Sequence, residues 1–225
     1  MQLDEVSEFL GTSFVGSDLS NQYLVGMDFA YAKMASSNLS NSVLRRANFS
    51  NARLFEADLK NANLQYADFE SACLVHANLS SADLQYSSAQ NGDFRYAILR
   101  EANLDSANWT GAALRRTNMS NATLKHSLFV DADFSHACLD SACLFGANLS
   151  GAHFAGSSLK KANFRFSNLK HTNFRGADLS HACLRDSNFR GADLRGANLK
   201  DADTFGADFT RAQLSYPILE SQSSN

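Results

Sequence analysis

Every fifth residue of this chain is large and apolar, from Phe9 to Leu219, without a single insertion. Leu, Phe, Met or Trp fills 41 of these 43 positions, and only Ala89 and Thr204 depart from the rule. Two residues earlier the chain is small, with 27 alanines, nine serines, three threonines and one glycine. The unit reads A-(D/N)-(L/F)-x-x, as in residues 57–61. This repeat commits most residues to architecture, so function is sought in the positions that it leaves free.

A period of five fits neither the 3.6-residue period of an α-helix nor the two-residue period of a β-strand. On a helix, steps of five would advance the apolar residue by about 500°, so it would visit every face. A fixed period in which each unit does the same geometric job indicates a solenoid. One large and one small inward residue in each unit predict a short extended segment followed by a turn.

Residues twenty apart sort into columns, which predicts four units in each coil. The column that begins at Phe9 is largely aromatic, and the column that begins at Leu19 is leucine except for Met119. Stacked coils would place these rings on one another, which is favourable beyond the burial of their area. The predicted structural core includes Phe29, Phe49, Phe69, Trp109, Phe129, Leu139, Phe164 and Phe189.

Glycine is confined to one phase of the unit, which marks a corner. Eleven of the 12 glycines stand two residues after the apolar position, and the exception is Gly92. Such a position favours unusual backbone angles. With these features the chain resembles the pentapeptide-repeat family over residues 7–219. The resemblance implies an all-β fold, a right-handed quadrilateral β-helix of about 10–11 coils with four five-residue units in each.

The unbroken register indicates one domain, with residues 1–8 as an N-terminal cap, 9–219 as the β-helix and 220–225 as a short tail. The net charge of −3 gives neither the excess of base typical of nucleic-acid binding nor a strongly acidic character. No export segment or membrane-length apolar run is evident, so we expect a cytoplasmic protein without direct contacts to nucleic acid or membrane. The four cysteines are expected to be reduced, because none lies directly above another.

No catalytic or metal-binding pattern stands out. The six histidines show no metal-ligand spacing with cysteine or with one another, and we interpret them as solvent-facing. Glycine-rich phosphate loops and nucleophile motifs are not evident. The many Asp and Asn residues before apolar positions are interpreted as structural hydrogen-bonding groups. We therefore predict a protein that is not an enzyme, with no catalytic residue, no metal site and no cofactor.

The free positions suggest two surfaces. We call the units centred on residues 9, 14, 19 and 24, and their repeats every twenty residues, sides A, B, C and D. Side D combines cationic and aromatic residues, and its candidate partner-binding residues are Arg46, Tyr66, Tyr86, His126, Phe145, Arg165, Phe166 and Phe205. Side A is net acidic, through Glu8, Asp28, Asp68, Glu70, Asp131 and Asp208. On side B, Phe55 and Tyr96 stand among arginines, which we interpret as ordinary solvated surface.

Two functional hypotheses remain open. The first is a non-catalytic protein-interaction or regulatory scaffold that uses the flat outer sides of the rod, with side D as the interface. Similar proteins include regulators that act through partner binding, as in cyanobacterial differentiation control. The alternative is a DNA mimic that binds DNA gyrase and protects it from inhibitors, which would use side A. An end of the rod could also mediate a homodimer, since an open coil presents unpaired strand groups.

Overall fold

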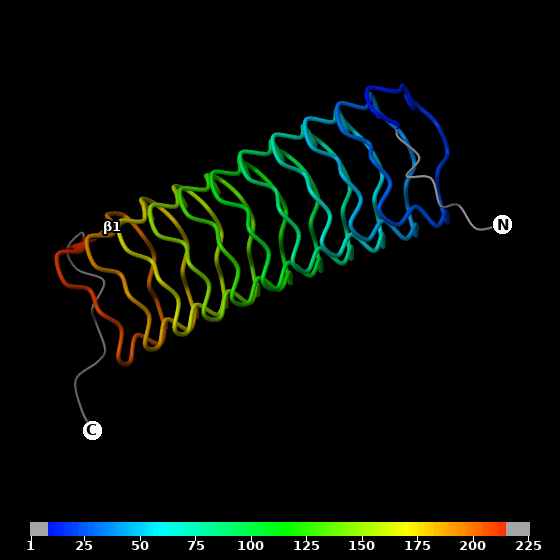
Figure 1. The fold of residues 1–225 in the computed structure, drawn as a ribbon. Coiled ribbons are helices and arrows are strands. Elements are labelled where there is room, and N and C mark those ends of the chain that lie inside the picture. The colour runs from blue at the N-terminus through cyan, green and yellow to red at the C-terminus, as the bar shows by residue number, and fades with distance from the viewer. Residues whose placement is uncertain (1–8, 215–225) are drawn as a thin grey trace.

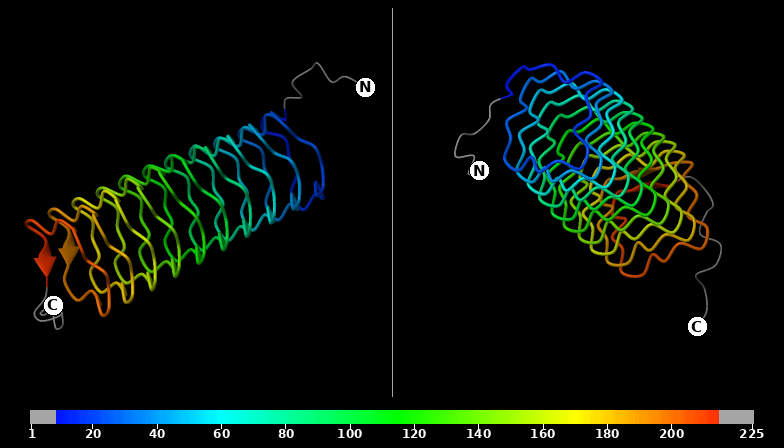
Figure 2. Two further views of the ribbon diagram at one scale, coloured as in Figure 1. Left: turned by 90° about the horizontal axis from the view of Figure 1, so that it is seen from below. Right: turned by 90° about the vertical axis from the view of Figure 1, so that its right-hand side faces the viewer.

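The computed structural model describes residues 9–214 as one straight rod, a right-handed quadrilateral β-helix (Figure 1). Successive coils lie over one another along its whole length, and the first and last described coils form opposite ends (Figure 2). The predicted N-terminal cap, the tail and the last apolar position, Leu219, lie outside the described residues.

Parallel backbone pairing between residues twenty apart holds the coils together. The pairing occurs at the residue before each apolar position, as between Asp58 and Asn78. Leu59 N donates to Asn78 O at 2.7 Å, and Asn78 N donates to Ala57 O at 2.9 Å. The extended segments are so short that almost all pairings are single bridges.

Two named strands mark the C-terminal end of the described rod. They are β1 (Asp193–Leu194) and β2 (Gln213–Leu214), which pair in parallel with Asp193 opposite Gln213. Residues 9–214 contain no helix, as the five-residue period predicts.

A tight turn closes every unit. In the unit around Leu59, Ala62 N donates to Leu59 O at 3.1 Å, and Asn61 between them has φ of 57°. Each residue two positions after an apolar residue, from 11 to 211, has positive φ, whether or not it is glycine. A β-turn with positive φ at its third residue resembles a type II turn, which favours Gly and Asn at that place. This requirement explains the confinement of glycine to one phase.

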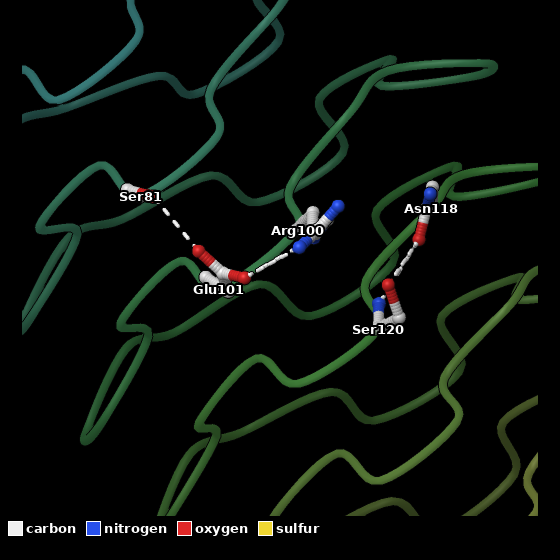
Figure 3. Close-up of polar contacts among 5 residues, drawn as sticks. All are labelled: Ser81, Arg100, Glu101, Asn118 and Ser120. Atoms are coloured by element: carbon white, nitrogen blue, oxygen red, sulfur yellow. Dashed lines mark hydrogen bonds and ion pairs between the residues drawn. The ribbon is translucent and has the colours of Figure 1, made fainter.

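The Asp and Asn residues before the apolar positions tie the turns together. The Asp58 carboxylate accepts a hydrogen bond from Lys60 N at 3.0 Å and from Asn78 Nδ2 at 3.1 Å, in the next coil. Figure 3 shows the contacts within one turn at Asn118, whose Oδ1 accepts hydrogen bonds from the backbone N–H and the hydroxyl of Ser120. These contacts support the interpretation that the polar phase is structural.

Inward rings stack along the rod where the columns are aromatic. All eight predicted core residues are at most 1% exposed. Along side A, the Phe29 and Phe49 ring centroids are 5.2 Å apart, and those of Phe49 and Phe69 are 5.0 Å apart, with the planes within 8° of parallel. The inward side chains of this column therefore repeat with the same regular spacing as the backbone coils.

At Ala89, where the large inward side chain is missing, a residue of the neighbouring side fills the space. The ring of Phe94, on side B, packs edge-on against Phe69 at 6.2 Å and stacks on Trp109 at 4.2 Å. Phe94 therefore occupies the space that a large residue at position 89 would fill. Ala89 itself remains completely buried.

Gly92, the glycine outside the turn position, leaves room for the Phe94 ring. A Cβ at Gly92 would lie 2.8 Å from the Phe94 ring and 3.2 Å from Ala89 O. The indole N–H of the buried Trp109 donates to the Ser87 hydroxyl at 3.0 Å, so its polar group is satisfied. Ala89, Gly92, Phe94 and Trp109 together form one packing unit.

Candidate functional site

The eight candidate residues of side D lie on a corner of the rod. Both positions after an apolar residue form the turn, and every candidate occupies one of them. We name the turn residues that follow side D, from Arg45–Arg46 to Phe205–Gly206, corner D. The flat surface of this side instead carries residues such as Asn63 and Asp83. The expectation of a flat interface is corrected in this respect.

Corner D begins with a cation–aromatic ladder. The Tyr66 and Tyr86 rings stack with centroids 4.8 Å apart and planes 9° from parallel, as their twenty-residue spacing predicts. The guanidinium carbon of Arg46 lies 5.8 Å from the Tyr66 ring centroid. Both tyrosines are about half exposed, at 46% and 51%. Their rings therefore present a pre-ordered surface to solvent.

A second cluster follows farther along the corner. Phe145 packs edge-on between His126 at 5.6 Å and Phe166 at 5.4 Å. Arg165 lies over the Phe166 ring at 5.4 Å, and its Nε is buried with no hydrogen-bond partner among the described residues. Toward the C-terminal end, Arg185 covers Phe205 at 4.6 Å.

Asp105 separates the two clusters. Its carboxylate accepts a hydrogen bond from Lys125 N at 2.8 Å and lies 3.9 Å from the Lys125 ammonium. Over the whole of corner D, five Arg or Lys residues stand against two carboxylates, Asp105 and Asp186. The corner is net basic although the chain as a whole is net acidic.

The corner after side B, which we name corner B, forms an unexpected second cluster. His76 stacks on Tyr96 at 4.9 Å and meets the edge of Phe55 at 5.9 Å. Arg116 lies 5.8 Å from the Tyr96 centroid, and an open depression is lined by Arg95, Tyr96, Arg115 and Arg116. The interpretation of side B as ordinary surface missed this cluster. Its signal was the column of residues 76, 96 and 116.

The acidic residues of side A do not form one surface of free carboxylates. Asp28 and Asp68 accept turn hydrogen bonds from Ala30 N and Glu70 N. Asp208 accepts a hydrogen bond from Thr210 N, and hydrogen bonds from the Thr210 hydroxyl and backbone lower the pKa of its carboxyl group. Arg190 also lies 3.6 Å from Asp208.

The remaining two acidic candidates, Glu70 and Asp131, are exposed at turns, and Glu8 lies outside the described residues. Side A thus combines a few free carboxylates with several that hold turns.

Other chemistry-bearing groups are dispersed. The six histidines are exposed, and the four cysteines are half-buried and free. Within the part of the chain that the structure describes, no three His, Cys, Asp or Glu side chains converge in a way that could hold a metal ion. None of residues 9–214 belongs to a helix long and apolar enough to cross a membrane.

Comparison with known families decides the assignment. The family of pentapeptide repeats matches in eight copies, which extend over residues 23–211. The chain belongs to the pentapeptide-repeat family. No curated protein sequence gives a significant match.

Two solved structures place this pentapeptide-repeat protein among its relatives. It is 31% identical to HetL, which is involved in heterocyst differentiation regulation in the cyanobacterium Nostoc sp. PCC 7120. The match covers 92% of this chain and 90% of HetL with a TM-score of 0.63. QnrB1, a plasmid-mediated fluoroquinolone resistance protein, is 21% identical over 89% of this chain and 94% of QnrB1, with a TM-score of 0.57. The likeness to QnrB1 concerns the fold alone.

Proposed function

We propose that this protein is a non-catalytic regulatory scaffold that binds a protein partner through corner D. The observation that carries the proposal is the series of aromatic rings along corner D, stacked at Tyr66 and Tyr86 and edge-on at Phe145 and Phe166. Arginines lie over the rings of Tyr66, Phe166 and Phe205. A few residues carry most of the binding energy of a protein interface, and they are enriched in Trp, Tyr and Arg. The similarity to HetL, a protein of differentiation regulation, supports a regulatory role.

Rigid presentation favours binding because little side-chain freedom is lost on association. Tyr66 and Tyr86 already support one another through ring stacking, and Phe145 already contacts both of its neighbours in the second cluster. A partner with acidic and apolar groups would complement the net positive charge of this corner.

The test is affinity capture with the full chain as bait, comparing wild type with the variant Tyr66→Asn/Tyr86→Asn/Phe166→Asn. Asparagine tolerates the positive φ of these three positions, so the turns are retained. We expect one protein to be enriched by wild type, lost with the variant, and then bound directly when purified. The matched control is Tyr23→Asn/Tyr31→Asn, which removes two exposed rings outside corner D. Equal loss with the control would contradict the proposal.

The gyrase-binding DNA mimic is the alternative, and it would require side A. Its support is weaker because Asp28, Asp68 and Asp208 hold turns. Purified gyrase provides the test: binding by wild type and by the corner D variant, but not by Glu70→Gln/Asp131→Asn, would favour this alternative.

Self-association through a rod end remains a separate proposal. Phe9, Phe14, Leu19 and Leu24 in the first coil are only partly buried within the described structure. Sedimentation equilibrium of the full chain distinguishes a monomer from a dimer. A monomer at all concentrations would contradict the dimer without affecting corner D.

A further inference from the structure

The depression on corner B has the composition of an anion site. It lies where the turn of Arg95 and Tyr96 meets the turn of Arg115 and Arg116, one coil farther along the rod. The backbone fixes this meeting, since Tyr96 N donates to Arg115 O at 3.0 Å. Three arginines and one tyrosine therefore line a single depression.

The three arginines differ in how closely a carboxylate of the protein pairs with them. Arg95 forms a two-point contact with Asp93, with Nε and Nη2 at 2.8 and 2.7 Å from the two carboxylate oxygens. Arg115 Nε is 3.7 Å from Asp133. Arg116 has no ion pair with a carboxylate within residues 9–214. The depression consequently keeps a net positive charge.

Arg116 is also oriented by its aromatic neighbour. Its guanidinium lies over the Tyr96 ring, and that ring stacks in turn on His76. A guanidinium that uses its face on a ring keeps the N–H groups along its edge for hydrogen bonds. The acidic residue in the same turn column, Glu56, precedes Tyr96 by two coils, about 10 Å at ~4.8 Å for each coil. It is therefore too far to occupy those donors.

We propose that this depression binds a single oxyanion group, a phosphate or a carboxylate, with Arg116 as the principal donor and Arg95, Arg115 and Tyr96 around it. The planar guanidinium group offers paired N–H donors that can bind two oxygens of a carboxylate or of a phosphate. Corner B lies diagonally opposite corner D around the four-sided coil, so the two surfaces can act independently.

The test is an NMR titration of arginine Nε–H signals in the full chain at low ionic strength. The probes are inorganic phosphate and, in a second arm, the blocked dipeptide acetyl-Glu-Glu-amide. We expect saturable shifts of the Arg116 and Arg95 signals with at least one probe. The arm that saturates at the lower concentration identifies phosphate or carboxylate as the preferred group. Added sodium chloride should weaken the binding, because exposed charges are screened.

The matched pair of variants is Arg116→Asn and Arg46→Asn. Both arginines occupy the positive-φ turn position, with φ of 59° and 58°, and both lie 5.8 Å from a tyrosine ring. Arg116→Asn should weaken anion binding about tenfold or more, whereas Arg46→Asn should leave it unchanged. Melting curves that match wild type show that both variants are folded.

Non-saturating shifts in both arms, or equal effects of the two variants, would overturn the proposal. Corner D is tested separately, because Arg116→Asn should retain the protein partner that the corner D variant loses.

Discussion

The packing around Ala89 shows how single residues compensate one another inside a strict repeat. Phe94 from side B fills the space that Ala89 leaves on side A, and Gly92 leaves room for the Phe94 ring. The sequence marks Ala89 and Gly92 as exceptions. It does not show that Phe94 links them, because Phe94 itself follows the rule.

Gly92→Ala should destabilise the fold by about 1–3 kcal/mol, since overpacking forces neighbouring groups apart. The added Cβ would lie 2.8 Å from the Phe94 ring. Urea unfolding of the full chain measures the change.

The double variant Gly92→Ala/Phe94→Leu supplies the control. If the ring is the obstacle, Gly92→Ala should cost less in the Phe94→Leu background than in wild type. Equal costs in both backgrounds would show that the backbone oxygens of Ala89 and Phe69, and not the ring, oppose the methyl group.

Asp193 gives a prediction for pH dependence. Hydrogen bonds from the Arg195 guanidinium, at 2.8 and 2.6 Å, hold the pKa of this carboxyl group below its usual value. A carboxyl group whose pKa is lowered on folding stabilises the protein above its unfolded pKa of about 3.9, and the effect is lost as the pH falls below that value.

Asp193→Asn removes the charge but keeps an oxygen that can accept from Arg195 N. Asp193→Asn should therefore be slightly less stable than wild type at pH 7, by at most about 1 kcal/mol, and the gap in melting temperature should narrow as the pH falls below about 3.9. A gap that stays constant from pH 7 to pH 3 would show that the ionic contact does not contribute.

At the scale of the five-residue unit, the turn imposes the strictest demand. The third residue of every turn has positive φ, which is unfavourable for residues other than Gly, Asn and Asp. The period and the phase of the glycines predict this turn well. They do not reveal that the turn side chains gather into the clusters of corners B and D. A five-residue period indicates only which residues point inward.

Lys161 tests the turn, since it is exposed and has φ of 59°. Lys161→Val should destabilise the protein by about 1–2 kcal/mol, because a β-branched residue is strained in the left-handed region. Lys161→Gly should be neutral or stabilising. Thermal melts measure both.

Lys33→Val is the matched control. Lys33 is also exposed but lies in the extended part of its unit, paired with Arg53. A β-branched residue suits that backbone, so this change should be tolerated. If both valine variants lost the same stability, the strain would not arise at the turn.

At the scale of the whole molecule, stability should vary along the rod. Within residues 9–214, each coil contacts only its neighbours, so the first and last described coils have one supporting neighbour fewer. Phe14 in the first coil is partly buried, whereas Phe94 in the middle is completely buried. Their backbone hydrogen bonds, Phe14 N to Lys33 O and Phe94 N to Ala113 O, have similar lengths of 2.7 and 2.8 Å.

Amide hydrogen exchange should therefore be at least about tenfold faster at Phe14 than at Phe94, because local opening is easier where fewer apolar groups are packed. Exchange followed by NMR gives both rates in one sample. Equal protection would indicate that the rod unfolds only as a single cooperative unit.

The twenty-residue columns predict much of the molecule's surface but not its function. They place Tyr86 on Tyr66, and they would also have placed Tyr96 on His76. They do not show that Asp93 already engages Arg95 while Arg116 stays unpaired by carboxylates in the described structure, because side-chain reach decides those contacts. Which arginines of corner B are already paired with a carboxylate therefore required the structure.

The four-sided coil sets two different rules for how such a chain can change length. Deleting one five-residue unit would preserve the alternation of small and large inward residues, so the β-helix could still close. Every residue beyond the deletion would nevertheless rotate by a quarter turn. A deletion between Tyr66 and Tyr86 would then move the second ring to a neighbouring corner. The fold should therefore tolerate insertions or deletions of five residues. A continuous corner surface is kept only when the length changes by a multiple of twenty residues.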